Sequence, residues 1–124
     1  MEQALSIYER LGDDNLSQLI DNFYERVFRS KVIGHLFQST TSELIKDKQF
    51  CFLTQFLGGP PRFNEKYGPP KMRMRHLPHA IDEKAKEEWL LLMKSAIEDL
   101  DIDEDFKSTL YTCFPNLAQF MVNR

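Results

Sequence analysis

The sequence DNLSQLIDNFYERV, residues 14–27, shows the clearest periodicity in this chain. Its apolar residues recur at steps of three and four, which places them on one face of an α-helix. The remaining positions are polar or charged, so we expect one face in a core and the other in water. Asp14 or Asn15 can cap its N-terminus. The apolar face comprises Leu16, Leu19, Ile20, Phe23, Tyr24 and Val27.

The same periodicity returns in three further segments, which span residues 45–56, 85–100 and 106–121. Thr40 and Glu43 have the spacing of a capping box before the first of them. Asp82 and Asp103 are expected to cap the other two. Pro115 lies inside the last segment and lacks a backbone N–H, so we expect a kink or a break there.

A shorter helical segment, at about residues 3–11, is expected to end at Gly12, a residue type that commonly terminates helices. No part of the chain alternates convincingly between apolar and polar residues with period two. The sequence therefore predicts an all-α protein.

Residues 58–70, GGPPRFNEKYGPP, hold three of the five glycines and four of the six prolines. We expect this segment to be a structureless loop, and a loop of this length in a small domain is often functional. From Arg62 to Arg75 there are five basic residues and one acidic residue, a local excess that favours an anionic neighbour.

The composition is that of an ordinary domain: 124 residues, 42% apolar and 28% charged, with a net charge of −3. We expect a single domain over residues 1–124. The negative charge argues against nucleic acid as a partner. No stretch is apolar and long enough for a membrane helix, and the N-terminus does not resemble a signal peptide. Two cysteines without a CxxC spacing favour a reducing, cytoplasmic setting, and their helical positions favour buried, unreactive thiols.

Three hydrogen-bond donors interrupt three different apolar faces: Tyr24, Gln49 and Trp89. Each is compatible with an ordinary core position. Buried polar groups need partners, however, so three donors on three inner faces can also converge on a buried ligand.

The chain has three histidines. His35 lies in a turn-like IGHLF sequence and is expected at the surface. His76 and His79 are close together, but no nearby cysteine or carboxylate cluster completes a zinc site. His76 follows several cations, which suits another arrangement, in which one neutral imidazole holds a haem iron and the cations pair with haem carboxylates.

Several motifs resemble those of group II truncated haemoglobins, in particular the forms from Gram-positive bacteria. They span nearly the whole chain and comprise SIYERLG (6–12), DNFYERV (21–27), FLTQFLGGPP (52–61), RMRHLP (73–78), Trp89 and MVN (121–123). The resemblance implies a two-over-two helical sandwich around haem b, an iron protoporphyrin. It implies that His76 is the proximal ligand of the iron, and that Tyr24, Gln49 and Trp89 are the distal donors.

The resemblance also assigns four residues that the pattern alone does not. Phe37 matches the aromatic residue that packs on the haem face. Lys48 and Arg75 match positions that pair with the haem propionates. Ile45 occupies the distal position, where related chains often carry histidine or a small or hydroxylated residue. It adds no donor there and is expected to narrow the entry of ligands.

Three further departures from the family pattern are visible. Gly12-Asp13 replaces a Gly-Gly pair, His79 stands where an apolar residue is common, and Pro115 is atypical in the last helix. We interpret His79 as reaching solvent, although a perturbation of the proximal side is the alternative.

The leading hypothesis is a haem protein for oxygen binding and transport, which binds O2 and other diatomic ligands reversibly with high affinity at an open distal site. The alternative is redox activity, either peroxidase-like turnover or detoxification of nitric oxide, which requires an external electron donor. Its ligands would be NO or peroxide, and CO is a further candidate ligand. Whether the chain is an enzyme stays open. A third hypothesis is a helical interaction module without a cofactor.

Overall fold

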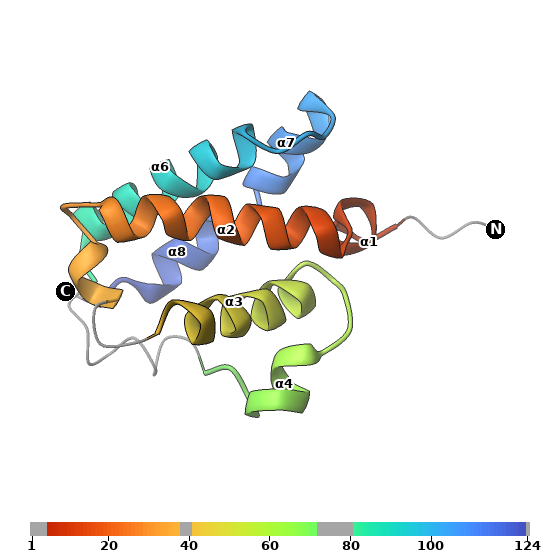
Figure 1. Cartoon of the computed structure of the whole chain (residues 1–124), viewed down its shortest axis with the longest axis horizontal. Coiled ribbons are helices and arrows are strands. Elements are labelled where there is room, and N and C mark those ends of the chain that lie inside the picture. The colour runs from red at the N-terminus through yellow and green to blue at the C-terminus, as the bar shows by residue number, and fades with distance from the viewer. Residues whose placement is uncertain (1–4, 38–40, 72–80, 124) are drawn as a thin grey trace.

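A computed structural model describes residues 5–37, 41–71 and 81–123, and all regular elements within these ranges are helices (Figure 1). The prediction of an all-α fold is confirmed. The elements are α1 (Ile7–Leu11), α2 (Asp13–Arg29), the 3₁₀-helix η1 (Gly34–Phe37), α3 (Ser42–Phe56), α4 (Arg62–Tyr67), α6 (Glu83–Glu98), α7 (Glu104–Tyr111) and α8 (Pro115–Met121).

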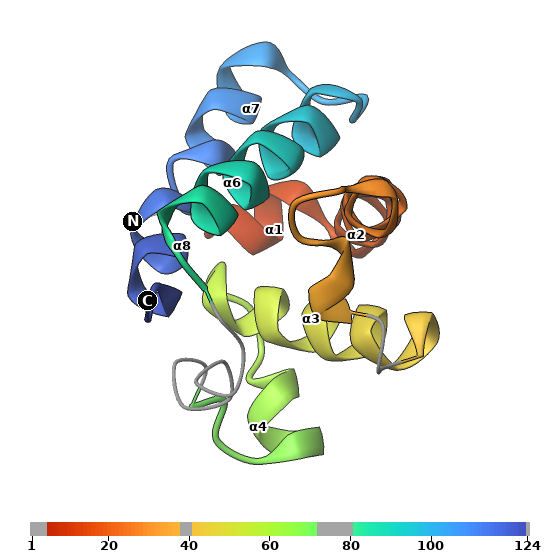
Figure 2. The ribbon, with the colours of Figure 1, turned by 90° about the vertical axis from the view of Figure 1, so that its left-hand side faces the viewer.

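Four helices form two layers. Helix α2 packs against α3 in one layer and against α6 in the other, where α6 packs against α8. Figure 2 shows the α6–α8 pair on one side of the molecule and α2 and α3 on the other. This arrangement is the predicted two-over-two helical sandwich. Helix α4 lies outside the layers and packs on α3.

The core begins on the apolar face of α2. All six residues of the face predicted from residues 14–27 are at most 3% exposed. Phe114 and Leu110 pack into the same core from the C-terminal helices, and Phe63 of α4 joins it. The periodicity of α2 therefore predicted its buried face correctly.

Several predicted helix caps are confirmed. Oδ1 of Asp82 accepts a hydrogen bond from the backbone N–H of Ala85, 2.8 Å away, and Asp103 accepts one from Phe106. Helix α1 ends at Gly12 as expected.

Two predicted caps are wrong. Helix α2 begins at Asp13, directly after Gly12, whose φ of +81° allows the chain to turn at once from α1 into α2. Asp14 and Asn15 therefore lie within the first turn, and the amide of Asn15 donates to the Leu11 carbonyl instead. The N-cap of α3 is Thr41, whose hydroxyl accepts from the N–H of Leu44. Thr40 lies outside the described residues.

The expectation of a structureless loop at residues 58–70 is also wrong, because α4 forms within it. The prolines and glycines mark the ends of this helix. Pro61 is the N-cap, and proline suits a helix start because the first backbone N–H groups have no partner within the helix. Gly68, with φ of +82°, terminates the helix at the other end.

The break predicted at Pro115 is confirmed. Helix α7 ends at Tyr111, and Pro115 is the first residue of α8, where its missing N–H costs no hydrogen bond. The change of direction lets α8 lie along α6 instead of continuing α7.

Cys51 is buried and Cys113 half-buried, and both are free thiols. Burial raises the pKa of both thiols, which lowers the thiolate fraction at neutral pH. This supports the expectation that they are unreactive.

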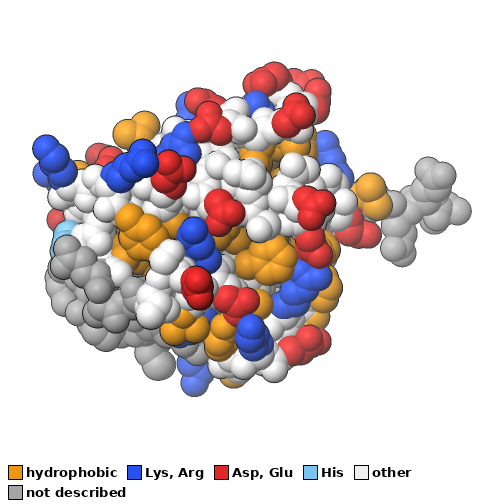
Figure 3. Space-filling view, viewed as in Figure 1, with side chains coloured by type: hydrophobic (Ala, Val, Ile, Leu, Met, Phe, Trp, Pro, Cys, Tyr) orange, Lys and Arg blue, Asp and Glu red, His pale blue; other side chains and the backbone are white. Residues whose placement is uncertain are grey.

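The surface in Figure 3 carries acidic and basic side chains interspersed, with apolar side chains between them. His35 is exposed, as predicted. Within the described residues, no helix has the length and hydropathy needed to cross a membrane.

Candidate functional site

An apolar cavity lies between the two layers, with walls from α2, η1, α3, α6 and α8. Most of its lining consists of aliphatic and aromatic side chains from both layers. These are Ile33, Leu36, Phe37, Ile45, Phe52, Ile81, Ala85, Leu117, Ala118 and Met121. The remaining lining residues are Tyr24, Lys48, Gln49, Lys86 and Trp89.

Tyr24 reaches the cavity from the buried face of α2. Its ring packs edge-on against Phe23 and Phe37, with ring centres 5.0 and 5.8 Å apart. The residue is 3% exposed, yet its hydroxyl makes no hydrogen bond to the described part of the chain. Burial raises the pKa of Tyr24 above its ordinary value, so the hydroxyl keeps its proton at neutral pH and is available as a donor.

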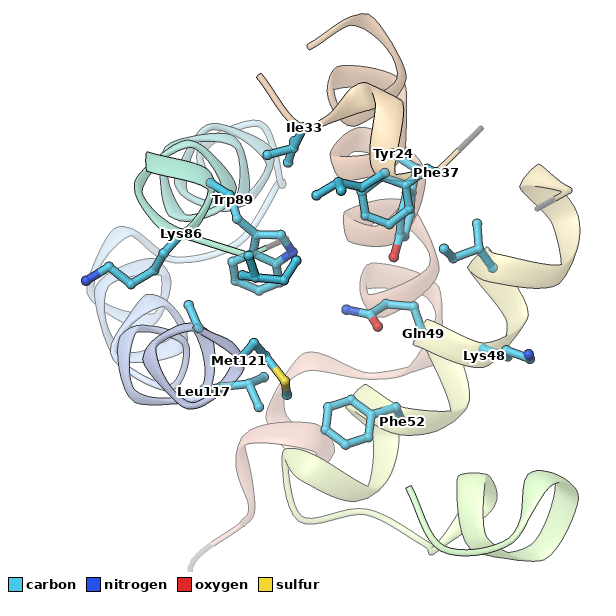
Figure 4. Close-up of a pocket in the computed structure, with 15 residues that line it drawn as sticks. Tyr24, Ile33, Phe37, Lys48, Gln49, Phe52, Lys86, Trp89, Leu117 and Met121 are labelled. Atoms are coloured by element: carbon cyan, nitrogen blue, oxygen red, sulfur yellow. The ribbon is translucent and has the colours of Figure 1, made fainter. Parts of the chain in front are cut away.

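Gln49 of α3 and Trp89 of α6 face the same space (Figure 4). The Trp89 ring is fixed between Phe23 and Phe114, with ring centres 5.2 and 5.8 Å away. Neither the amide of Gln49 nor the indole N–H of Trp89 hydrogen-bonds within residues 5–37, 41–71 and 81–123. In Figure 4 the Tyr24 hydroxyl, the Gln49 amide and the Trp89 nitrogen are directed toward the interior of the cavity.

The free energy of burial makes this arrangement informative. A buried donor without a partner costs about 1–3 kcal/mol, so cores rarely contain three together. Among the described side chains that are not exposed, no fully occluded nitrogen or oxygen atom lacks a partner. The three donors are therefore accessible from the cavity, where a ligand can accept from them.

The other predicted residues lie as follows. Phe37 lines the cavity from η1, and Ile45 lines it from α3. Lys48 also lines it, but its ammonium group points away in Figure 4 and lies 5.6 Å from the ring centre of Tyr67. His76 and Arg75, like His79, lie outside the described residues.

The sequence reasoning missed Lys86. Its side chain lines the cavity, while its Nζ bonds Oε1 of Gln119 at 2.7 Å and Oε2 of Glu83 at 2.6 Å. The contact with Gln119 joins α6 to α8, whereas the pair with Glu83 lies within α6. No sequence signal pointed to Lys86, because its partner Gln119 is 33 positions away and lies on another helix.

A second contact joins the residues just before α6 to those just after α8. The N–H of Ile81 donates to Oδ1 of Asn123 at 3.1 Å, and the N–H of Asn123 donates to the Ile81 carbonyl at 2.8 Å. Ile81 is itself a lining residue, so this pair fixes one wall of the cavity relative to the end of α8.

The lining fits haem, which is largely apolar, carries two carboxylates and holds a small polar ligand on one face. Aliphatic and aromatic walls suit the macrocycle, and the donors from three helices suit the small ligand. Within the described residues, no group of three His, Cys, Asp or Glu side chains could hold a metal ion directly.

Fold and cavity together are those of a small helical protein that encloses an apolar group between two pairs of helices. The chain belongs to the bacterial-like globin family, whose pattern matches residues 6–123. It is 39% identical to the group 2 truncated haemoglobin YjbI of Bacillus subtilis, over 94% of this chain and 88% of that protein. Membership of the globin family implies that the chain binds haem.

Solved structures agree. The structure superposes on the group II truncated haemoglobin of Bacillus anthracis with a TM-score of 0.90, at 33% identity and over 98% and 94% of the two chains. The truncated oxygen-avid haemoglobin of Bacillus subtilis gives a TM-score of 0.88 at 39% identity, over 96% of this chain and all of the other. The resemblance read from the sequence is thereby confirmed.

Proposed function

We propose that this chain, as a single domain over residues 1–124, binds haem b and holds dioxygen reversibly and with high affinity. The observation that carries the proposal is the set of three donors, Tyr24, Gln49 and Trp89, which face one apolar cavity without partners among the described residues. The similar Bacillus subtilis protein is described as oxygen-avid, which supports the same ligand here.

Haem supplies the iron that takes up the diatomic ligand, and His76 is the proposed protein ligand of that iron. The protein's own part is to stabilise the ligand by hydrogen bonds. Dioxygen gains partial negative charge when it binds, and a hydrogen bond to a charged group contributes about 1.5–3 kcal/mol. Since 1.4 kcal/mol corresponds to a factor of about ten, each well-placed donor slows ligand escape by about tenfold or more.

The other lining residues complete the proposed site. Phe37 would pack on the haem face, and Lys48 and Arg75 would pair with the propionates. For Lys48 this pairing would require the ammonium group to move from the ring of Tyr67. Ile45 adds bulk without a donor and so narrows the path of ligands into the cavity. Nitric oxide and carbon monoxide are further proposed ligands, because the same site accepts diatomic molecules in general.

Redox turnover of peroxide or nitric oxide is the weaker proposal. It requires an external electron donor, and no feature of the described residues favours it over reversible binding. A cytoplasmic location is proposed as well, and the two free thiols support it because they suit a reducing compartment.

The direct test is the visible spectrum of the purified protein supplied with haem, in the ferric and ferrous states. The wild type is expected to bind one haem with five-coordinate ferrous character, and His76→Gly to change or lose this spectrum. His35→Gly is the matched control, since His35 is exposed and its substitution should have no effect. If His79→Gly abolishes the spectrum and His76→Gly does not, the assignment of the iron ligand is wrong. A folded wild type without haem contradicts the proposal as a whole.

A further inference from the structure

Lys86 belongs both to the wall of the cavity and to the surface of the protein. Its side chain lines the apolar space, whereas its ammonium group points away from that space in Figure 4. Only 18% of the side chain is exposed. A long aliphatic stem can cover apolar surface while its charged end stays in water. The stem of Lys86 is therefore part of what separates the cavity from solvent.

The ammonium group is held by two side chains that are also bonded to each other. Nζ of Lys86 lies 2.7 Å from Oε1 of Gln119 and 2.6 Å from Oε2 of Glu83. Nε2 of Gln119 donates to Oε1 of Glu83 at 3.3 Å. Hydrogen bonds from Lys86 and Gln119 lower the pKa of Glu83, so its carboxylate stays charged at neutral pH. The three side chains thus form a closed ring of contacts, a latch between α6 and α8.

The wall that this latch spans contains small as well as long side chains. Helix α6 contributes Ala85 and α8 contributes Ala118, which are both buried and both line the cavity. The side chain of alanine is a single carbon, so longer neighbours must close the space beside it. Leu117 and Met121 are such neighbours on α8, and Lys86 is one on α6. At this point the wall therefore depends on a side chain whose position is fixed at the surface.

The latch differs from the neighbouring contact between Ile81 and Asn123. That contact consists of two hydrogen bonds that use the backbone N–H groups of both residues, so it breaks only if the chain itself moves. The latch uses side chains only, and the side chain of Glu83 is 57% exposed. Exposed ion pairs are weak, and exposed side chains change rotamer rapidly. The latch can therefore open while both helices stay in place.

We propose that Lys86 is a gate for the diatomic ligand. With the latch closed, its stem blocks a route into the cavity between α6 and α8, and the ligand passes when the latch opens. This inference rests on the proposed function, because it takes a diatomic molecule as the ligand. Within the described residues, no member of the latch is bonded to Tyr24, Gln49 or Trp89. Lys86 therefore acts on the passage of the ligand, whereas the three donors act on the bound ligand.

The two roles differ in their kinetics. A donor stabilises the bound ligand, so its loss raises the dissociation rate constant and weakens the equilibrium affinity. A gate restricts passage equally in both directions. Its removal raises the association and dissociation rate constants by the same factor, and the equilibrium affinity stays the same.

The test compares Gln119→Ala and Lys86→Ala with the wild type, each loaded with haem. Gln119→Ala breaks the latch and leaves the cavity lining intact, whereas Lys86→Ala removes the stem as well. Oxygen association is measured after laser photolysis, and oxygen dissociation by stopped flow. Both rate constants should rise about two- to fivefold in Gln119→Ala, the factor by which the loss of one exposed contact increases the open fraction. The rise in Lys86→Ala should be at least as large.

A second readout depends neither on iron nor on the donors. Zinc protoporphyrin replaces haem in the same three proteins, and the lifetime of its excited triplet state is measured at increasing concentrations of dissolved oxygen. The quenching rate constant reports how often oxygen reaches the porphyrin. In both variants it should rise by the same factor as the association rate constant.

Lys107→Ala is the matched control. Lys107 lies in α7 and, like Lys86, pairs with a glutamate three positions before it, Glu104, at 3.1 Å. Its side chain is 14% exposed, which is close to the value for Lys86, but it does not line the cavity. Its substitution should lower stability by a similar amount and leave the oxygen rate constants and the quenching unchanged.

The outcomes separate this inference from the proposed function. A wild type that binds neither haem nor oxygen contradicts the proposed function, and the gate with it. If the wild type binds both and the quenching is unchanged in the two variants, the gate alone is overturned. A rise in the dissociation rate constant alone also overturns it, because Lys86 would then act on the bound ligand. An equal rise in Lys107→Ala overturns it as a general loosening. If Lys86→Ala does not fold, the exposed Gln119 decides.

Discussion

Two tyrosines mark the difference between the cavity and the surface around α4. The hydroxyl of Tyr24 is buried and has no partner among the described residues, whereas the hydroxyl of Tyr67 donates to the Asp47 carboxylate. Tyr8, at the other end of α4, is bonded to Asp13 in the same way as Tyr67. The same chemical group is thus left free in one region and fully used in the other.

The difference indicates which polar groups hold the fold together and which await a ligand. A donor that bonds a carboxylate stabilises the folded chain, and its partner is already present. A donor that faces an apolar cavity without a protein partner is available to a ligand that accepts from it. Tyr24, Gln49 and Trp89 belong to this second group, and the convergence of three accessible donors on one apolar space is the argument for a ligand in the cavity.

The largest expected effect on stability comes from a substitution of Gly59. This glycine packs against Tyr8, whose hydroxyl bonds Asp13 beside the first end of α4. A Cβ atom at Gly59 would lie 2.5 Å from Cδ2 of Tyr8 and 2.8 Å from the carbonyl oxygen of Thr54. Gly59→Ala should displace the Tyr8 ring and weaken its bond to Asp13. We expect the free energy of unfolding to fall by about 1–3 kcal/mol, measured by urea denaturation of the haem-free protein.

Gly68→Ala is the contrast for this prediction. A Cβ at Gly68 meets no atom within 4 Å, so its cost arises only from the positive φ of +82°. We expect a loss of about 1–3 kcal/mol with the hydrogen bond from Tyr8 to Asp13 intact, because a positive φ combined with a ψ of −169° is a backbone region essentially restricted to glycine. Gly59→Ala would contradict the packing described here if it were as stable as the wild type.

The next prediction compares Tyr67→Phe with Tyr24→Phe. Both substitutions delete a phenolic hydroxyl, but they should change the stability of the haem-free protein in different directions. Tyr67→Phe removes a hydrogen bond to a carboxylate and should lower the stability of the haem-free protein by about 1 kcal/mol. Tyr24→Phe removes a donor that has no partner in the described structure, so stability should stay the same or rise. Urea midpoints of the two variants and the wild type test this. A loss at Tyr24 as large as at Tyr67 would mean that the Tyr24 hydroxyl is part of the scaffold.

The smallest expected effect is on the pH dependence of the stability of the folded protein. Hydrogen bonds from Arg62 and Lys66 hold the pKa values of Asp13 and Asp47 below the ordinary value. Their contribution to stability is therefore present above the unfolded-state pKa of about 3.9 and is lost as pH falls through the lower folded-state pKa. Since both side chains are 40% exposed or more, each contributes less than about 1 kcal/mol.

Acid titration of stability measures this contribution. The wild type should lose stability more steeply below about pH 4 than Asp13→Asn/Asp47→Asn, and the two curves should converge at the lowest pH. Parallel curves would show that these carboxylates are not stabilised in the folded protein.

Much of the fold follows from local sequence patterns. The buried face of α2, the caps at Asp82 and Asp103 and the break at Pro115 each depend on residues a few positions apart, so periodicity and capping chemistry predict them. Helix α4 was not predicted, because the high content of proline and glycine in residues 58–70 is typical of a loop. Only the order of these residues, with the prolines before the helix and a glycine after it, indicates a short helix. The cap at Thr41 differs from the expected one by a single position.

The candidate site divides in the same way. Tyr24, Gln49 and Trp89 are identifiable in the sequence because a donor on an apolar helical face is unusual. Lys86 and the ion pairs at the ends of α4 are not, since they depend on contacts between distant segments, such as the 49 positions between Asp13 and Arg62. No local pattern encodes such a pair, and an exposed charge in the sequence gives no sign of its partner.

The oxygen dissociation rate of haem-loaded Tyr24→Phe, measured by stopped flow beside Tyr67→Phe, tests the central claim most directly. Both substitutions delete one phenolic hydroxyl, but only Tyr24 faces the cavity. We expect the rate to rise about tenfold or more in Tyr24→Phe and to stay within about twofold of the wild type in Tyr67→Phe. An unchanged rate in Tyr24→Phe, or an equal rise in both variants, would contradict the claim that free donors in the cavity hold the ligand.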